Sequence, residues 1–249
     1  MAFVWSGTYS EFAAAVEASQ SGQSDVFSAH TWLQRQAALV NQTSNESWTE
    51  ASVQGRRPSS LPMLLAEAAP TDLIIDFGGG SGWVYSNLQE IGLEPSRYVV
   101  MDLPNVTKYF QSHPIAGVEH KAFGNRFSIE GLQNRVMYAN SSLQYAPDNK
   151  ILSEHIKMFR PNVLVIDELP WTQGSEDWFT VQRNSDIAVV ARFVSLPSLI
   201  EQMRELDLGL VWSGAFGSGH DLYAFPDMSN FSGHLAIDHG KSLVFRKIV

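Results

Sequence analysis

The sequence predicts an α/β fold in which a mostly parallel sheet carries helices on both faces. From residue 71 onward, short runs rich in β-branched residues alternate with segments of helical period. This is the pattern of parallel strands joined by crossover helices. The chain has 249 residues, of which 44% are hydrophobic and 17% are charged. One large α/β domain of this composition can bury a sizeable core.

Seven strands are expected, and most of them are short apolar runs. They are residues 72–77, 98–101, 118–123, 135–139, 163–166, 208–212 and 242–245. The expected helices between them are residues 83–91, 105–111, 151–159 and 197–206. Two long connections, 168–194 and 214–241, are expected to be loops. Loops of this length in compact α/β domains usually carry function.

The N-terminal part of the chain has a different pattern from the rest. Residues 1–70 are expected to form a helical cap on a domain made by residues 71–249. A polar stretch rich in Ser and Asn interrupts the cap and is expected to be a loop. The helices expected in the cap are residues 11–18, 26–40 and 61–69.

Net charge indicates which macromolecular partners the chain can bind, and cysteine content indicates its redox compartment. The formal net charge is −9 and the pI is about 5.2, which is a poor match to a nucleic-acid backbone. The chain has no cysteine, which fits a reducing compartment. Its N-terminus lacks a basic region followed by a long apolar core, and its apolar runs are too short to span a bilayer. We expect a soluble cytoplasmic protein, monomeric or homodimeric, with no nucleic-acid or membrane partner.

A glycine-rich segment follows the first expected strand of the domain. Residues 76–82 read Asp-Phe-Gly-Gly-Gly-Ser-Gly and open a helix. Glycines allow a tight turn and a close approach to a ligand, and the N–H groups of a helix start can bind its polar atoms. A dinucleotide fingerprint needs a third glycine, but Trp83 or Tyr85 occupies that position.

The segment instead resembles motif I of the class I, Rossmann-like methyltransferases. The resemblance implies S-adenosylmethionine as cofactor and S-adenosylhomocysteine as product. It also implies that Asp102, at the end of the second strand, accepts hydrogen bonds from the ribose hydroxyls. The cofactor-binding residues expected on this basis are Asp76, Gly78, Gly79, Gly80, Gly82, Asp102, Leu103, Ser141, Ser142 and Tyr9.

A more specific resemblance covers residues 5 to about 215. Residues 5–12, 76–80, 141–145 and 180–182 are similar to blocks of a family of bacterial proteins classed as methyltransferases. Members of that family often accompany genes for surface-polysaccharide synthesis, which implies a glycan intermediate as acceptor. The family tends to carry Asp-Arg-Thr-Pro after the fifth strand, whereas residues 167–170 here read Asp-Glu-Leu-Pro. This departure puts the inherited acceptor, but not the cofactor, in question.

Methyl transfer from a sulfonium is an in-line displacement, so the protein mainly aligns the reacting atoms. A hydroxyl acceptor also benefits from a base. The candidates for catalytic residues are Asp167 and Glu168, beside the expected acceptor pocket, and His220, in the long loop after the sixth strand. No metal is expected, because Asp167 lacks a clear partner and the chain has neither cysteine nor a His-x-x-x-His pair.

Four functions are compared on these grounds. The first is O-methylation of a small molecule or glycan intermediate. The second is an inactive S-adenosylmethionine-binding module with a regulatory or scaffolding role. The third is a nicotinamide-dependent oxidoreductase, which Trp83 and Tyr85 disfavour. The fourth is a serine hydrolase, but this chain lacks the Gly-x-Ser-x-Gly elbow that is expected of that class. We expect the first.

Overall fold

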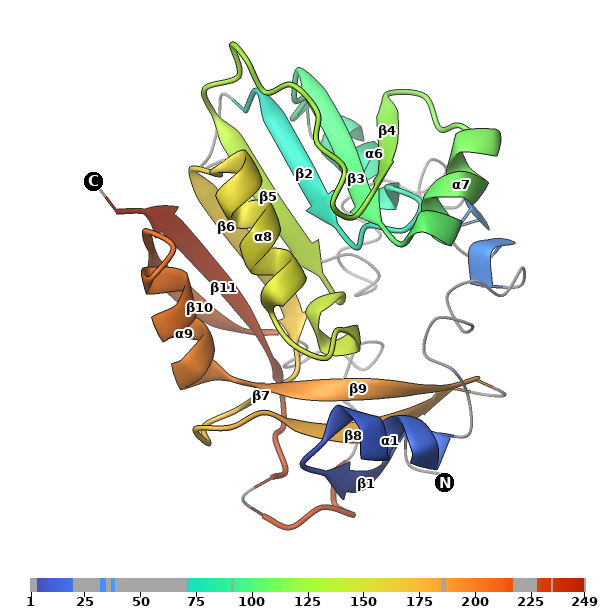
Figure 1. Ribbon diagram of the computed structural model, residues 1–249, viewed down its shortest axis with the longest axis vertical. Coiled ribbons are helices and arrows are strands. Elements are labelled where there is room, and N and C mark those ends of the chain that lie inside the picture. The colour runs from blue at the N-terminus through green and yellow to red at the C-terminus, as the bar shows by residue number, and fades with distance from the viewer. Residues whose placement is uncertain are drawn as a thin grey trace.

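A seven-stranded sheet forms the centre of the molecule (Figure 1). The computed structural model describes residues 4–19, 32–34, 37–38, 71–90, 92–184, 187–216, 228–233 and 235–248. The strand order is β10-β11-β6-β5-β2-β3-β4. All neighbouring pairs from β6 to β4 are parallel, and β11 runs antiparallel to both β6 and β10. The predicted seven-stranded, mostly parallel sheet is therefore confirmed.

The strands of this sheet lie close to their predicted positions. They are β2 (Leu73–Phe77), β3 (Arg97–Asp102), β4 (Val118–Ala122), β5 (Arg135–Asn140), β6 (Val163–Leu169), β10 (Leu208–Phe216) and β11 (Gly240–Lys247). The helices between them are α6 (Trp83–Glu90), α7 (Pro104–Ser112), α8 (Lys150–Phe159) and α9 (Leu196–Arg204).

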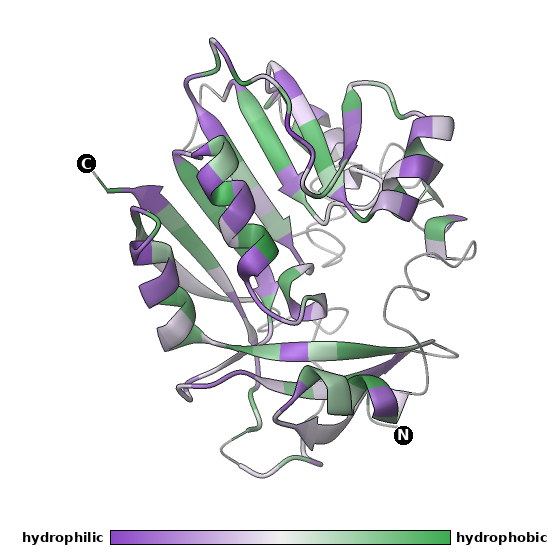
Figure 2. Ribbon diagram, in the orientation of Figure 1, coloured by the Kyte–Doolittle hydropathy of each residue, from purple (hydrophilic) through white to green (hydrophobic). Residues whose placement is uncertain are grey.

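Helices cover both faces of the sheet, and alternation along each strand divides the core in two. Leu73 and Ile75 of β2 pack in the same cluster as Leu152 of α8 and Leu199 of α9. Ile74 points to the other face, into the cluster that contains residues of α6. Figure 2 shows the same division, with apolar strands inside and the polar sides of α8 and α9 outside. Because both faces are covered, the central strands β2, β5 and β6 are mostly apolar along their length.

A second, four-stranded sheet corrects one prediction. Residues 168–194 were expected to be a loop but form β7 (Trp171–Thr172), β8 (Trp178–Asn184) and most of β9 (Ile187–Ser195). The sheet order is β1-β8-β9-β7. Both long strands are rich in β-branched and aromatic residues, which favour strands. In Figure 1 this small sheet crosses beside the arrowheads of β5 and β6, at the carboxyl ends of the parallel strands.

The small sheet also contains the start of the chain. β1 (Trp5–Tyr9) pairs antiparallel with β8, and α1 (Phe12–Ser19) follows it. The N-terminal cap therefore begins with a strand, whereas helices alone were predicted. Helix 11–18 is confirmed as α1, residues 26–40 are described only in part, and 61–69 lie outside the described residues. No helix among the described residues is long and apolar enough to cross a membrane.

Candidate functional site

The glycine loop turns at the carboxyl edge of the large sheet, between β2 and α6. The Gly78 N–H donates to the carbonyl of Met101, the residue before the end of β3, at 2.7 Å. The Gly82 N–H donates to the Gly79 carbonyl at 2.9 Å. Gly78, Gly80 and Gly82 have φ angles of 71°, 58° and 76°, a region that favours glycine. Residues other than glycine would therefore be strained at these three positions of the turn.

Two of these glycines are also required by space. A Cβ on Gly79 would lie 2.2 Å from the carboxyl carbon of Asp76. A Cβ on Gly78 would lie 2.5 Å from the Cβ of Ser142, in the loop after β5. The segment is therefore packed tightly from below and from the side by two of the predicted cofactor-binding residues.

Asp102 links the end of β3 to the glycine loop. Its Oδ2 accepts from the Gly80 N–H at 2.8 Å, and its Oδ1 accepts from the Leu103 N–H at 2.7 Å. The side chain is almost fully buried, and this burial raises the pKa of Asp102 to about 6, against the lowering effect of the two N–H donors. Each carboxylate oxygen can still accept a further hydrogen bond. Asp102 thus occupies the place that the sequence predicted for a ribose-binding acid.

Asp76 lies beneath the loop, in the apolar interior. Its Oδ2 accepts from the Tyr98 hydroxyl at 2.5 Å, and the residue is 1% exposed. Burial raises the pKa of Asp76 to about 7, although the hydrogen bond from Tyr98 opposes the shift and the nearby Asp102 adds to it. The contact with Gly79 and the bond to Tyr98 make Asp76 a support for the loop. Direct contact with a cofactor stays a prediction.

Asp76→Asn is expected to gain stability relative to the unchanged chain as the pH rises from about 4 to about 7. The carboxyl has a pKa of 3.8 when unfolded and about 7 when folded. The folded state therefore keeps a proton that the unfolded state has lost, and its stability falls as the pH rises through this window. Asparagine has no such proton. Unfolding midpoints measured at both ends of the window check this, and a constant difference between the two proteins would contradict it.

His120 of β4 is a loop contact that the sequence analysis missed. Its Nε2 donates to the Gly80 carbonyl at 3.2 Å, and its ring stacks on Phe110 of α7 at 5.0 Å between centroids. Burial lowers the pKa of His120 to about 4, so the ring is neutral near pH 7. The signal that could have found it is the parallel register of β3 and β4, which pairs His120 with Val100 near the loop.

The turn after β5 brings polar atoms to the same edge of the sheet. Ser141 has a φ of 50°, which is rare for a residue other than glycine. Its hydroxyl accepts from the Gln144 side-chain amide at 3.0 Å. Three side-chain oxygens in this turn are buried with no hydrogen-bond partner among the described residues: Asn140 Oδ1, Ser142 Oγ and Gln144 Oε1. Buried polar atoms are normally paired, so these oxygens are suited to meet donors of a ligand.

The two predicted carboxylates near the end of β6 differ in their surroundings. Asp167 is 1% exposed and accepts from the Ser242 hydroxyl of β11 and, at 3.2 Å, from the Glu168 N–H. Glu168 has a φ of 52° and is only partly buried. Desolvation raises the pKa of Glu168 to about 7, against a hydrogen bond from Ser141 and with a smaller contribution from Asp167. Asp167 is thus anchored inside the sheet, and Glu168 is the carboxylate at its edge.

Two residues in strained backbone therefore lie side by side. The Ser141 N–H donates to the Asp167 carbonyl at 3.1 Å, which joins the ends of β5 and β6. Left-handed backbone at Ser141 and Glu168 costs about 1 kcal/mol or more for each residue. Such strain is concentrated at functional sites. Because these two residues lie beside the glycine loop, this edge of the sheet is the candidate active site.

The remaining predicted site residues lie elsewhere. Tyr9, at the end of β1, packs with Phe179 and Val190 of the small sheet, and its ring covers the space beside Gly7. A role of Tyr9 in cofactor binding stays a prediction. His220 lies outside the described residues. In the described ranges, no group of three or more His, Asp or Glu side chains could hold a metal ion.

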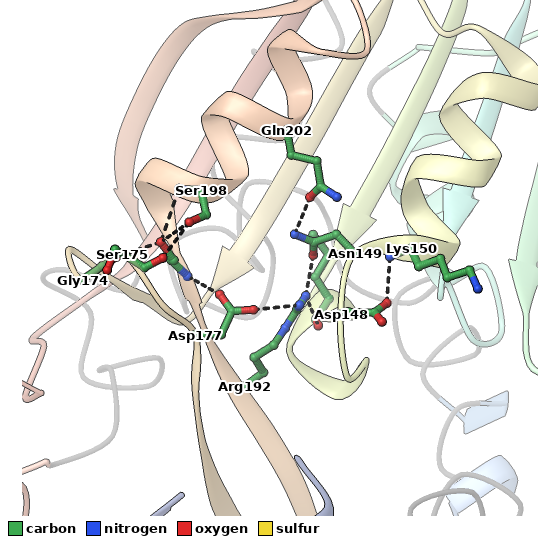
Figure 3. A network of polar contacts seen from close by, with 11 residues as sticks. Asp148, Asn149, Lys150, Gly174, Ser175, Asp177, Arg192, Ser198 and Gln202 are labelled. Carbon is green, nitrogen blue, oxygen red and sulfur yellow. Dashed lines mark hydrogen bonds and ion pairs between the residues drawn. The ribbon is translucent and has the colours of Figure 1, made fainter. Parts of the chain in front are cut away.

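A buried arginine connects the small sheet to the turn after β5 (Figure 3). Arg192 of β9 is fully buried and binds Asp177 Oδ2 at 3.1 Å. It also donates to the Leu143 carbonyl at 3.2 Å and to Asn149 Oδ1 at 2.5 Å. Leu143 begins the short helix η1 (Leu143–Tyr145). The sequence analysis missed this residue, because an arginine within a strand usually faces solvent.

A second contact joins the same two parts of the molecule. The Tyr145 hydroxyl donates to Gln182 Oε1 of β8 at 3.0 Å. The sequence blocks that contain Tyr145 and Gln182 are therefore partners in space. Together with Arg192, they hold the small sheet against the candidate active site.

Comparisons with known proteins identify the fold. No protein-family model and no curated protein matches the chain. A chain of the Haloferax volcanii complex that contains the Trm112 methyltransferase activator is 12% identical, with a TM-score of 0.56, over 92% of this chain and 98% of that one. Burkholderia thailandensis 1,6-didemethyltoxoflavin-N1-methyltransferase, bound to its namesake compound and S-adenosylhomocysteine, is 14% identical, with a TM-score of 0.50, over 87% and 90%.

A third structure is longer than this chain. LepI in complex with SAM is 18% identical, with a TM-score of 0.46, and the match covers 76% of this chain but only 47% of LepI. The chain thus spans about half the length of that protein. At these identities the comparisons establish the fold, which is that of the class I methyltransferases.

Proposed function

We propose that this chain is an S-adenosylmethionine-dependent methyltransferase that acts on a hydroxyl of a small molecule or glycan intermediate. The observation that carries the proposal is the glycine loop bonded through Gly80 to Asp102. This hydrogen bond supports the proposal because it joins the glycine loop to the carboxylate that we expect to bind the ribose hydroxyls. A protein of the same fold from Burkholderia thailandensis binds S-adenosylhomocysteine, which supports the assignment.

The residues present fit this cofactor. The side chains of Ser142 and Asp76 fill the places where Cβ atoms of residues 78 and 79 would lie, so only glycines allow the loop this shape. The unpartnered oxygens of Asn140 and Ser142 can accept from the amino group of its methionine end. When bound, the cofactor supplies a methyl group that its positive sulfur already activates. The protein then has to orient the acceptor and remove its proton.

Glu168 is the base that we favour among the three predicted candidates. A base works best when its pKa lies near the working pH, and burial raises the pKa of Glu168 to about 7. Asp167 is already occupied by Ser242 and by the backbone. Glu168 also stands where the similar bacterial family tends to carry arginine, so an acceptor with a free hydroxyl or a positive group suits this chain better than an anionic one.

The small sheet would form the wall of the acceptor pocket. It lies beside the carboxyl edge and is bonded to the turn after β5 through Tyr145 and Gln182. The resemblance to proteins from surface-polysaccharide gene clusters supports a glycan intermediate as acceptor. The absence of cysteine fits action in the cytoplasm. We propose that the chain acts there as a monomer or homodimer.

Calorimetric titration of the purified chain with S-adenosylhomocysteine tests the proposal, with NADH as the competing ligand class. Micromolar binding of S-adenosylhomocysteine and none of NADH is expected. Binding of NADH alone would favour an oxidoreductase, and binding of neither by the folded chain would refute the cofactor assignment. Cofactor binding without turnover across hydroxyl acceptors would favour the inactive module.

Asp102→Ala is expected to weaken S-adenosylhomocysteine binding by about 100-fold. The substitution removes the ribose acceptor and also the bond that fixes Gly80, and each hydrogen bond to a charged group contributes about 1.5–3 kcal/mol. The same titration measures it. Glu201→Ala removes an acid that is 60% exposed on α9 and serves as control. An equal loss of S-adenosylhomocysteine binding in both variants would mean that the net charge of the protein, and not the position of Asp102, causes the loss.

A further inference from the structure

A cavity lies away from the glycine loop, at the opposite end of the parallel strands. Its volume is about 470 Å³, and its walls include Arg126, Phe127, Ile129, Lys157, Met158 and Arg160. Arg160 ends α8 just before β6, and its carbonyl accepts from the guanidinium of Arg135, the first residue of β5, at 3.0 Å. The cavity thus lies at the amino ends of β5 and β6. Its volume falls in the range of small-molecule sites.

Three cations line this cavity in a chain of net charge −9. Arg126, Lys157 and Arg160 are all exposed, and no acidic residue is among the residues that line it. Within the described part of the chain, none of the three forms an ion pair, whereas Arg97, Arg192 and Arg204 each bind a carboxylate. The three charges are therefore available to an anion.

The wall beneath these cations is apolar and firmly held. Phe127 stacks on Phe159 with 4.6 Å between ring centroids. The Arg97 guanidinium lies 4.5 Å from the centroid of Phe127, and Glu119 holds Arg97 at 2.6 Å. Since the Phe127 ring is occupied in this way, the side chains left for a ligand are the aliphatic Ile129 and Met158. Aliphatic contact therefore suits this wall better than stacking of a planar base.

Arg160 adds an independent observation. It caps the C-terminus of α8 with a φ of 46°, at a position where glycine or asparagine is usual. An arginine there costs about 1 kcal/mol in backbone strain. A charged side chain in an unfavourable backbone conformation at the wall of a cavity is typical of a residue kept for binding.

We propose that this cavity binds a small organic phosphate that carries a short aliphatic group. Two guanidinium groups and one ammonium can bind the oxygens of a dianionic phosphate, and Ile129 and Met158 contact the aliphatic part. The site is separate from the glycine loop, so the inference does not rest on the proposed methyltransferase activity.

Calorimetry at low ionic strength with hexyl phosphate tests the proposal, in the presence of saturating S-adenosylhomocysteine to keep the glycine loop occupied. Should the chain not bind S-adenosylhomocysteine, the same titration is run without it. Hexyl phosphate is expected to bind more tightly than inorganic phosphate, and hexanol is expected not to bind. Arg160→Asn should weaken binding by about tenfold, in line with one lost charge-assisted contact. Asparagine tolerates left-handed backbone, so this variant should unfold at the same or a higher temperature.

Two controls make the result decisive. Arg204→Gln removes one exposed charge on α9 and should leave binding unchanged. Equal loss in Arg204→Gln, or no binding of either phosphate by the unchanged chain, would overturn the proposal. Sedimentation with phosphatidylglycerol vesicles tests whether the phosphate that binds belongs to a lipid headgroup rather than to a soluble molecule. Vesicle binding without binding of soluble hexyl phosphate would replace the cavity site with a membrane surface.

Discussion

Arg192→Met is expected to lower the free energy of unfolding by about 3 kcal/mol. Removing one partner of a buried ion pair leaves the other uncompensated, which costs about 3–5 kcal/mol. The lower end applies because the side chain of Asp177 remains 28% exposed and can regain water. The substitution also leaves the Leu143 carbonyl and Asn149 without their donor. Methionine fills most of the volume, so the loss comes mainly from the polar network.

Denaturant unfolding of the two proteins measures this difference. Arg204→Met is the matched control, because Arg204 and Glu201 form a pair that is 63% and 60% exposed. Exposed pairs of this kind contribute about 1 kcal/mol or less. A loss for Arg192→Met no larger than that of the control would mean that the network in Figure 3 does not hold the small sheet in place.

Gly79→Ala is expected to reduce S-adenosylhomocysteine binding by about 100-fold or more. A Cβ at this position would lie 2.2 Å from the buried Asp76 carboxyl. The carboxyl cannot move easily, since Tyr98 holds it at 2.5 Å, so the loop must move instead. A misplacement of about 1 Å can lower the rate of a positioned reaction by about 100-fold, and we expect a loss of binding of the same order. Titration calorimetry measures the loss.

Gly233→Ala provides a control of the same chemical kind. No heavy atom lies within 4 Å of a Cβ placed on Gly233, so its substitution tests the added methyl group without a clash. Neither position has a φ in the left-handed region, so the comparison isolates the steric effect. Full binding by Gly79→Ala would show that the loop adapts and that its tight packing is not needed.

The sequence predicted the large sheet well because its signals are local. Most of its strands are largely apolar runs that end near a turn, and the glycine loop follows β2 directly. The small sheet was missed because it depends on a contact between distant segments: Trp5 of β1 pairs with Gln182 of β8. The β-branched and aromatic residues of β8 and β9 favour strands, but which strands pair depends on contacts between distant parts of the chain.

The sequence predicted several residues of the candidate site but not the contacts between them. Asp76 and Asp102 were expected from the resemblance to motif I, and Glu168 from its position at the end of the fifth strand. Their different roles depend on neighbours that only strand register brings close, such as Tyr98 beside Asp76. His120 and Arg192 were missed because their partners are distant in the sequence: the Gly80 carbonyl in the glycine loop and the Asp177 carboxylate just before β8.

The pairing of β1 with β8 sets an order for folding during synthesis. Ribosomes add about 5–20 residues per second, so β1 leaves the ribosome roughly ten to thirty seconds before its partner strand. During that interval Trp5, which ends 3% exposed, has neither Trp178 nor Phe193 to cover it. The large sheet can begin to assemble in the meantime. β1 is thus made well before the strand that it pairs with and is among the last elements to reach its place.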